Sequence, residues 1–333
     1  MQVNPHREAL VRLLADGMEH SGESLARTLG VSRAAVWKQV RTLGHLGLAV
    51  RSLPRRGYQL DRRLDLMDAE LLKQHLALAP GSAFSAVRVE FEVESTNSEL
   101  LAVGPPPQDQ MSACIAEYQS SGRGRRGRFW IAPLASGLCL STSWSFAGLP
   151  AQISSLGLVA GVAVAMALDS LDVPGVMLKW PNDLWIDGRK LGGILIEMRA
   201  ETAGPTFVVI GVGLNVDLPD AARRLVQQNG VPPIDLHTAL CATAPSRTLL
   251  ASRIIVEMLH CLRRFSIDGF APFLYEWRRR DALAGRSVTI VHPDRVVLGE
   301  ANGIDEDGAL LILTADRLRR EISGDVSVRV AEA

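Results

Sequence analysis

The charged residues of this chain are divided unevenly along its length, and this division constrains its organisation most. Residues 1–64 hold 11 basic and 5 acidic residues, a net charge of +6 in a chain that is neutral overall. The remainder therefore carries −6. A chain of 333 residues is also longer than one hydrophobic core usually serves. The sequence therefore predicts two or three domains, the first of them small and basic.

Composition and patterning exclude several other classes of protein. Apolar residues make up 47% and charged residues 22%, as in an ordinary globular chain. The first residues lack an apolar signal core, and the most apolar stretch, Leu156–Leu168, is shorter than the roughly 20 residues of a membrane span. We expect a buried helix there, a cytoplasmic location and no membrane partner. Cys114, Cys139, Cys241 and Cys261 form no C-x-x-C pair, so we expect reduced thiols rather than zinc ligands or disulfides.

The basic N-terminal part has the pattern of a helix-turn-helix. Apolar residues of Arg7–Leu14 recur at helical spacing, and a second helix is predicted after Ser21 and before Gly30. Ser32 is placed to cap a third helix, which runs to about Leu43 and leaves cations on its outer face. Two short helices joined by a glycine-containing turn, the second with a basic face, are typical of DNA-binding modules.

A β-hairpin is predicted to follow, with strands at Leu48–Arg51 and Tyr58–Leu60 and a turn at Pro54–Gly57. The whole module then has the pattern of a winged helix, in which hairpin cations suit phosphate and the third helix suits the major groove. A helical domain whose basic face contacts other proteins remains the alternative. The residues predicted to contact DNA are Ser32, Arg33, Trp37, Lys38, Arg41, Arg55 and Arg56.

Hydroxyl and amide side chains follow a predicted strand at Val87–Val93. They allow two interpretations. Thr96 and Glu99 have the spacing of a helix capping box, and the segment taken alone favours that interpretation. The same groups could instead form the polar edge of a pocket that binds a neutral ligand.

The most unusual segment is Gly122–Arg128, which follows a predicted strand at Met111–Tyr118. It holds four arginines and three glycines in seven residues, a composition unsuited to helix or strand. Glycine permits close approach of the backbone to a ligand, and arginine supplies paired donors for phosphate or carboxylate. A loop ordered by an anionic ligand, a loop that grips nucleic acid and a solvated loop all fit this composition.

A second basic site is predicted at a hairpin whose turn is Asp187-Gly188. We expect Lys179–Asp183 on one strand and Lys190 at the start of the next. Lys190 either extends to solvent or neutralises a transferring phosphate. The glycines of Gly211–Asn215 permit close approach, but no third glycine opens a helix, as a Rossmann motif requires. P-loop, zinc-ligand and G-x-S-x-G patterns are also missing from the sequence.

The C-terminal part reads as two helices followed by a small β-barrel. The expected helices are Thr248–Phe265 and Gly269–Arg280. The expected strands are Gly285–Val291, Val296–Glu300, Ala309–Leu313 and Val326–Val330, with turns at Asn302-Gly303 and Asp307-Gly308.

Three segments, in order, resemble the biotin protein ligase family: Cys114–Arg128, Lys179–Leu184 and Gly188–Glu197. With the winged helix in front, the chain resembles bifunctional ligases and biotin-operon repressors of the BirA type. The resemblance implies an α+β chain with a winged helix-turn-helix at 1–64. It also implies a catalytic domain at 65–283, with a mixed sheet like that of class II aminoacyl-tRNA synthetases, and an SH3-like barrel at 284–333.

The resemblance also implies a two-step reaction. Biotin and ATP form biotinyl-5′-AMP, and a lysine of the biotin carboxyl carrier protein of acetyl-CoA carboxylase then takes the biotinyl group. Mg²⁺ is the implied metal, although its ligands are not identifiable. Biotinyl-5′-AMP would act as corepressor by promoting a homodimer on operator DNA. A lipoate ligase, a ligand-sensing repressor without ligase activity and a ligase with a vestigial DNA-binding half remain alternatives.

Residue roles follow from the same motifs. The implied catalytic residues are Lys190, Arg125 and Asp183. Biotin is expected to contact Ser95, Thr96, Asn97, Gln119, Gly122, Arg123, Gly124, Arg125 and Lys190. The nucleotide is expected to contact Arg125, Arg128, Asn182, Asn215 and Arg329.

Overall fold

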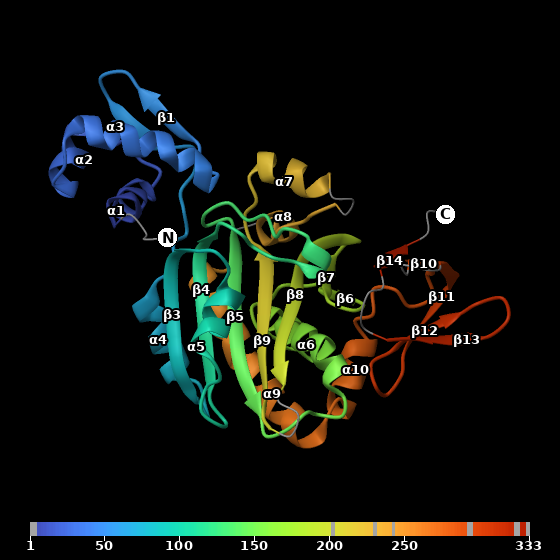
Figure 1. Ribbon diagram of the computed structural model, residues 1–333. Helices are drawn as coiled ribbons and strands as arrows, with labels where there is room; N and C mark the ends of the chain where they lie inside the picture. The colour runs from blue at the N-terminus through green and yellow to red at the C-terminus, as the bar shows by residue number, and fades with distance from the viewer. Residues whose placement is uncertain are drawn as a thin grey trace.

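The computed structural model describes residues 5–200, 204–228, 232–241, 244–291, 296–322 and 327–330. Residues 327–330 are described by their backbone alone. A helical N-terminal domain, a central sheet with its helices and a small C-terminal sheet follow one another along the chain (Figure 1). The predicted α+β class is confirmed. Among the described residues, none of the helices is long and apolar enough to cross a membrane.

The three predicted N-terminal helices are present, and the first begins two residues earlier than predicted. They are α1 (Pro5–Leu14), α2 (Gly22–Leu29) and α3 (Arg33–Thr42). The Ser21 hydroxyl caps α2 by accepting from the Ser24 amide at 3.0 Å, and the Ser32 hydroxyl caps α3 by accepting from the Ala35 amide at 3.2 Å. Gly30 ends α2 with φ +64°, a conformation that costs glycine little.

The predicted wing is present as β1 (Val50–Leu53) and β2 (Gly57–Leu60), paired antiparallel. Strand β1 begins two residues later than predicted. Leu48 instead follows a 3-10 turn (η1, Leu43–Leu46) and is bonded back to it, since its amide donates to the Leu43 carbonyl; its side chain is buried.

The central sheet has seven strands in the order β3-β4-β5-β9-β8-β7-β6. Only the β3–β4 pair is parallel. Strand β5 and the reversal between β6 and β7 were not predicted. The strands are β3 (Phe84–Val93), β4 (Met111–Gln119), β5 (Gly137–Phe146), β6 (Met177–Lys179), β7 (Asp183–Ile186), β8 (Arg189–Ala200) and β9 (Thr206–Asn215).

Helices cover the two faces of this sheet unequally. Helices α4 (Ala69–Ala77), α6 (Leu156–Asp169) and α9 (Arg247–Asp268) pack on one face, whereas α5 (Thr96–Val103) lies on the other (Figure 1). Helix α6 is the buried helix predicted from the most apolar stretch. The β8 side chains Ile194 and Ile196 contact it, so the alternate residues of β8 face α5. The α5 face is therefore the less covered one.

The remaining helices depart from the prediction. The expected helix Gly269–Arg280 is shorter, because Pro272 lies in a separate 3-10 turn (η4, Ala271–Phe273) before α10 (Leu274–Arg278). Helices α7 (Asp220–Gln227) and α8 (Leu236–Leu240) follow β9 and were not predicted.

The C-terminal domain is a five-stranded antiparallel sheet in the order β13-β12-β11-β10-β14. The turn predicted at Asn302-Gly303 was wrong: the register shifts there between Ala301 and Ile304, so the pair forms a bulge within β11. Strand β13 was missed because it is mostly charged. The strands are β10 (Ser287–Val291), β11 (Val296–Ile304), β12 (Leu310–Leu313), β13 (Leu318–Glu321) and β14 (Ser327–Val330).

Both end domains rest on the central one. The N-terminal core includes Leu134 of the central domain, whose amide donates to the Leu46 carbonyl at 2.9 Å. Arg62 donates to Asp217 at 2.5 Å. At the other end, the buried Trp180 indole donates to the Gly308 carbonyl at 3.0 Å. The cavity described next therefore lies in the central domain with a neighbour at each side.

Candidate active site

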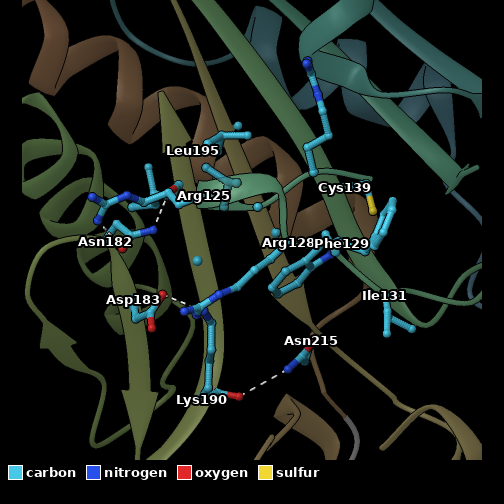
Figure 2. Close-up of a pocket in the computed structure, with 18 of the residues that line it drawn as sticks. Arg125, Arg128, Phe129, Ile131, Cys139, Asn182, Asp183, Lys190, Leu195 and Asn215 are labelled. Carbon is cyan, nitrogen blue, oxygen red and sulfur yellow. Dashed lines mark hydrogen bonds and ion pairs between the residues drawn. The ribbon is translucent and has the colours of Figure 1, made fainter. Parts of the chain in front are cut away.

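A cavity of about 950 Å³ opens on the α5 face of the sheet (Figure 2). It is bounded by the start of α5, the arginine loop and the strands β5 and β7–β9. Most of the predicted site residues meet here. Those that line it are Ser95, Thr96, Asn97, Gln119, Arg123, Gly124, Arg125, Arg128, Asn182, Asp183, Lys190 and Asn215.

Two predicted ligand contacts, Gly122 and Arg329, are not among the described residues that line the cavity. Gly122 lies at the base of the arginine loop, where an added Cβ would come 2.7 Å from the Trp130 carbonyl oxygen. Its lack of a side chain therefore serves the folding of the loop. The side chain of Arg329, in β14, lies outside the described residues.

One end of the cavity is built from buried hydroxyl and amide groups. The amide and hydroxyl of Thr96 donate to Gln119 Oε1 at 2.8 and 3.1 Å. The Ser141 hydroxyl, on β5, lies 2.6 Å from Thr96 Oγ1 and 2.5 Å from Asn97 Oδ1. This end carries neutral donors and acceptors suited to an uncharged polar ligand group.

The interpretation of Thr96 as a helix cap was wrong. Ser95 occupies the cap position of α5 and makes no side-chain cap hydrogen bond, and Thr96 is the first helical residue. The Thr96 hydroxyl instead has Gln119 and Ser141 as its partners. The alternative interpretation, a polar pocket edge, is the one that the geometry supports.

The glycines of β9 form the floor beneath these groups. An added Cβ at Gly213 would come 2.5 Å from the Trp130 ring, and one at Gly211 would overlap Asn97 Oδ1. The sequence predicted that these glycines allow a close approach to the backbone. Side chains of the protein itself, Trp130 and Asn97, make that approach. Trp130 and Asn97 both line the cavity from these positions.

The arginine loop folds over the cavity. The Trp130 amide donates to the Gly122 carbonyl at 2.9 Å, and the Gly124 amide donates to the Arg128 carbonyl at 2.7 Å. Arg125 reaches across to donate to Asn182 Oδ1 at 3.1 Å (Figure 2). Composition alone allowed a loop that binds a small anionic ligand, one that grips nucleic acid and one that is merely solvated. The position of the loop over the cavity favours the first.

Lys190 lines the cavity from β8, and its Nζ is 2.6 Å from Asp183 Oδ1 (Figure 2). The prediction of Lys179–Asp183 as one strand was wrong. The chain reverses at the cis Trp180–Pro181 peptide, so Lys179 pairs with Asp183 across the β6–β7 hairpin.

A bulge in β8 orients Lys190. Asp183 pairs with Gly193 and Leu184 with Gly192, but Trp185 pairs with Lys190, so Leu191 is the extra residue. Side chains alternate in a strand, and one inserted residue reverses the side on which all later ones lie. The buried Leu191 can thus join the core while Lys190 faces the cavity with Asp183 and Trp185.

The winged helix presents the predicted cations on a separate surface. Arg33, Lys38 and Arg41 are exposed on α3, and the Arg41 guanidinium stacks over the half-exposed Trp37 ring at 4.8 Å. At the wing, Arg55 and Arg56 are both exposed. Arg56 Nε donates to Glu19 Oε2 at 2.7 Å.

The chain is similar to known proteins along most of its length. Residues 91–215 match the Biotin/lipoate A/B protein ligase family, residues 6–59 an HTH domain and residues 284–329 the Biotin protein ligase C terminal domain. The chain is 37% identical to the bifunctional ligase/repressor BirA of Escherichia coli strain K12 over 324 residues, 97% of each chain. It belongs to the bifunctional ligase/repressor family.

Two further similarities agree with this family. The biotin–[acetyl-CoA-carboxylase] ligase of Mycobacterium tuberculosis is 34% identical over 272 residues, 80% of this chain and 97% of that protein. The biotin protein ligase of Aquifex aeolicus, solved with biotin and ATP, has a TM-score of 0.61 at 24% identity. That similarity covers 74% of this chain and the whole of the other, and it shows the shared fold.

Several residues in and beside the cavity were not singled out in the sequence. Ser141 and Cys139 come from the unpredicted strand β5, and Trp185 lies beneath Lys179, whose Nζ is 4.3 Å from the ring centroid. For this lysine, its place at the start of the Lys-Trp-Pro-Asn-Asp segment was the sequence signal that could have identified it. Burial raises the pKa of Cys139 to about 11, so its thiol stays protonated at neutral pH and is not a nucleophile.

Metal-binding capacity in the cavity is limited. No group of three or more His, Cys, Asp or Glu side chains suited to a metal occurs among the described residues. Asp183 is the one carboxylate in the described lining. Mg²⁺ binds proteins through one or two carboxylates and takes its other ligands from water and phosphate. The site therefore fits Mg²⁺ only as an ion that arrives with a nucleotide.

Proposed function

We propose that this protein activates biotin with ATP to biotinyl-5′-AMP and transfers the biotinyl group to a lysine of a biotin carboxyl carrier protein. We propose further that its winged helix represses transcription of biotin synthesis genes, with biotinyl-5′-AMP as corepressor. The observation that carries the first proposal is the polarity of the cavity. Neutral hydrogen-bonding groups gather at the start of α5, the neutral end, and Lys190 and Arg125 are held beside Asp183 and Asn182, the cationic end.

The neutral end suits the ureido ring of biotin. Thr96, Asn97 and Gln119 offer hydroxyl and amide groups, and Trp130 and Cys139 add apolar surface beside them. A ring that is polar and uncharged gains hydrogen bonds here without the desolvation of an ionic group. Ser95 and Gly124 complete this part of the site.

The cationic end suits the reacting groups. The carboxylate of biotin and the α-phosphate of ATP repel each other, and a fixed cation between them lowers that repulsion most where charge accumulates in the transition state. Lys190 is placed for this role because Asp183 and the β8 bulge fix its position. Arg125 and Arg123 would close over the product.

Asp183 has a second proposed role in the transfer step. When phosphate oxygens of the ligand share Lys190, the Asp183 carboxylate becomes available to the ammonium group of the incoming carrier lysine. The lysine gives a proton to the Asp183 carboxylate, and its nitrogen attacks the carbonyl carbon of the mixed anhydride. The amide bond forms, the bond from that carbon to the phosphate oxygen breaks, and AMP leaves. The folded arginine loop would keep water from the anhydride until the carrier arrives.

Nucleotide contacts are proposed for the groups that surround the cationic end. Asn182, Arg128 and Asn215 line it, and Asn215 is held by the Lys190 and Ile234 carbonyls at 3.3 and 3.0 Å. Arg329 is proposed to reach the phosphates from the C-terminal domain. Mg²⁺ would supply charge neutralisation on the phosphates, with Asp183 as its nearest carboxylate.

The organisation of the whole chain is part of the proposal. We propose domain limits at 1–64, 65–283 and 284–333, a cytoplasmic location and a homodimer in the adenylate-bound state. The carrier is proposed to be that of acetyl-CoA carboxylase. Two copies of the winged helix in one dimer can bind two half-sites of operator DNA.

The full-length protein, ATP, Mg²⁺, labelled biotin and an apo carrier domain test the enzymatic proposal. We expect label on the carrier and no competition from lipoate. Folded protein that leaves the carrier unlabelled would refute the ligase activity, and effective competition by lipoate would reassign the substrate. An operator shift that requires both biotin and ATP tests the repressor activity, and ligand-independent or absent binding would refute it.

A further inference from the structure

A continuous hydrogen-bonded chain joins the neutral end of the cavity to the arginine loop. It starts at Gln119 and Thr96, passes through the Ser141 hydroxyl to Asn97, and continues to Glu197 on β8. Glu197 appears in none of the roles proposed above, although it forms the last link. Its carboxylate meets the loop through Arg123.

Both contacts of Glu197 use the same oxygen. Asn97 Nδ2 donates to Glu197 Oε2 at 2.8 Å, and Arg123 Nη2 donates to the same Oε2 at 2.8 Å. Hydrogen bonds to an ionised acceptor are shorter and stronger than neutral ones. If Asn97 moves, the shared oxygen moves with it, and the hydrogen bond from Arg123 changes as well.

The surroundings leave Asn97 little freedom. Its side chain is buried against Gly211, where an added Cβ would overlap it, and its amide nitrogen also donates to the Leu195 carbonyl at 3.4 Å. Its Oδ1 lies 2.5 Å from the Ser141 hydroxyl. The amide nitrogen and the amide oxygen of Asn97 are both hydrogen-bonded, so Asn97 holds Glu197 in one place.

Arg123 is held at its outer end by a second residue of α5. Its Nη2 donates to the Ser98 hydroxyl at 3.0 Å as well as to Glu197. The Arg123 and Glu197 side chains are 42% and 26% exposed, so the pair is partly open to solvent. Residue 123 also bridges to Phe129 across the loop, so the position of Arg123 sets the position of the loop base.

We propose that Glu197 is a positioning residue that fastens the arginine loop to the end of the cavity where the biotin ring would bind. Its carboxylate connects Asn97 to Arg123, so that a ligand that fixes Thr96, Ser141 and Asn97 also stabilises the closed loop. This inference rests on the proposed function for its ligand. Its consequence is retention of biotinyl-5′-AMP between the two steps, rather than the rate of adenylate formation.

Glu197→Gln tests this proposal because it keeps the size of the side chain and removes its charge. We expect the dissociation rate of biotinyl-5′-AMP from the full-length protein to rise about tenfold. The maximal rate of adenylate formation at saturating biotin and ATP should stay within about twofold. Glu99→Gln is the matched control, since Glu99 is on α5 but its nearest cation is Arg88, at 3.9 Å.

A double-variant comparison separates positioning from general destabilisation. If Glu197 acts through Arg123, the pair Arg123→Gln and Glu197→Gln should release the adenylate no faster than Arg123→Gln alone, within about twofold. Effects that multiply, or an unchanged dissociation rate in Glu197→Gln at an unchanged melting temperature, would overturn the proposal.

Trypsin cleavage of the ligand-free protein gives a measurement that does not depend on the proposed reaction. The loop offers trypsin several arginines, and Glu197→Gln should speed cleavage within Gly122–Arg128 severalfold while Glu99→Gln does not. Equal cleavage of wild type and Glu197→Gln would contradict the proposal even in a protein that ligates biotin. A wild-type protein that forms no adenylate, yet shows the difference in cleavage, would refute the proposed function alone.

Discussion

The molecule has two clusters of cations with similar chemistry and different surroundings. On the winged helix, Arg33, Lys38 and Arg41 project from the outer face of α3. In the central domain, Arg123 and Arg125 turn back onto the protein, where Glu197 and Asn182 hold them beside a cavity. Cations on a convex face match an extended polyanion, whereas cations that converge on a cavity match one small anion.

This difference explains why composition alone could not identify the ligand of the arginine loop. Arginine offers the same donors to DNA and to an adenylate. What separates the two uses is whether the donors converge and how far water is excluded around them. Substitutions in one cluster should therefore leave the function of the other intact.

Lys190→Ala should have the largest effect. We expect adenylate formation to fall by about 10³-fold, roughly 4 kcal/mol, because a fixed charge beside the reacting groups is lost. Single-turnover formation of labelled biotinyl-5′-AMP measures this. Operator binding by the variant should return when preformed biotinyl-5′-AMP is supplied. A variant that keeps more than a tenth of the wild-type rate would show that the comparison assigns the wrong cation.

Replacing Lys38 and Arg41 together by Ala should weaken operator binding by about 100-fold, because contacts of this kind contribute roughly 1–3 kcal/mol each. The slope of log affinity against log salt should also become shallower. Electrophoretic shifts at several salt concentrations give both values. Carrier labelling by the same variant serves as control and should stay within about twofold, and a parallel loss of labelling would mean that the two clusters are not separate.

Arg62→Ala should have the smallest effect of the three. Arg62 joins the winged helix to the central domain through Asp217, but the two side chains are 26% and 48% exposed. Partly exposed pairs contribute about 0–1 kcal/mol, so we expect the free energy of unfolding in urea to fall by no more than that. Arg51→Ala, which breaks the exposed pair with Asp61 inside the winged helix, is the matched control. A much larger loss for Arg62→Ala would show that the two regions depend on each other for stability.

Local features of the fold were predictable because each is decided by neighbouring residues. Ser21 and Ser32 cap their helices, Gly30 ends α2, and Asp187-Gly188 turns the chain between β7 and β8. The apolar stretch of α6 could only be a buried helix. Asn302-Gly303 has the same local pattern as a turn, but pairing of β11 with β12 makes it a bulge.

By itself, therefore, the sequence determined the domain order, the two basic regions and most of the residues that meet in the cavity. Only the tertiary structure decided how they face one another. Lys190 reaches the cavity because Leu191 is the extra residue in the β7–β8 pairing, and strand alternation makes that single shift reverse a side chain's direction. Glu197 meets Asn97 and Arg123 because β8, α5 and the loop pack together across about a hundred residues of chain. Register and packing between distant segments are collective properties of the folded chain, and local patterns do not encode them.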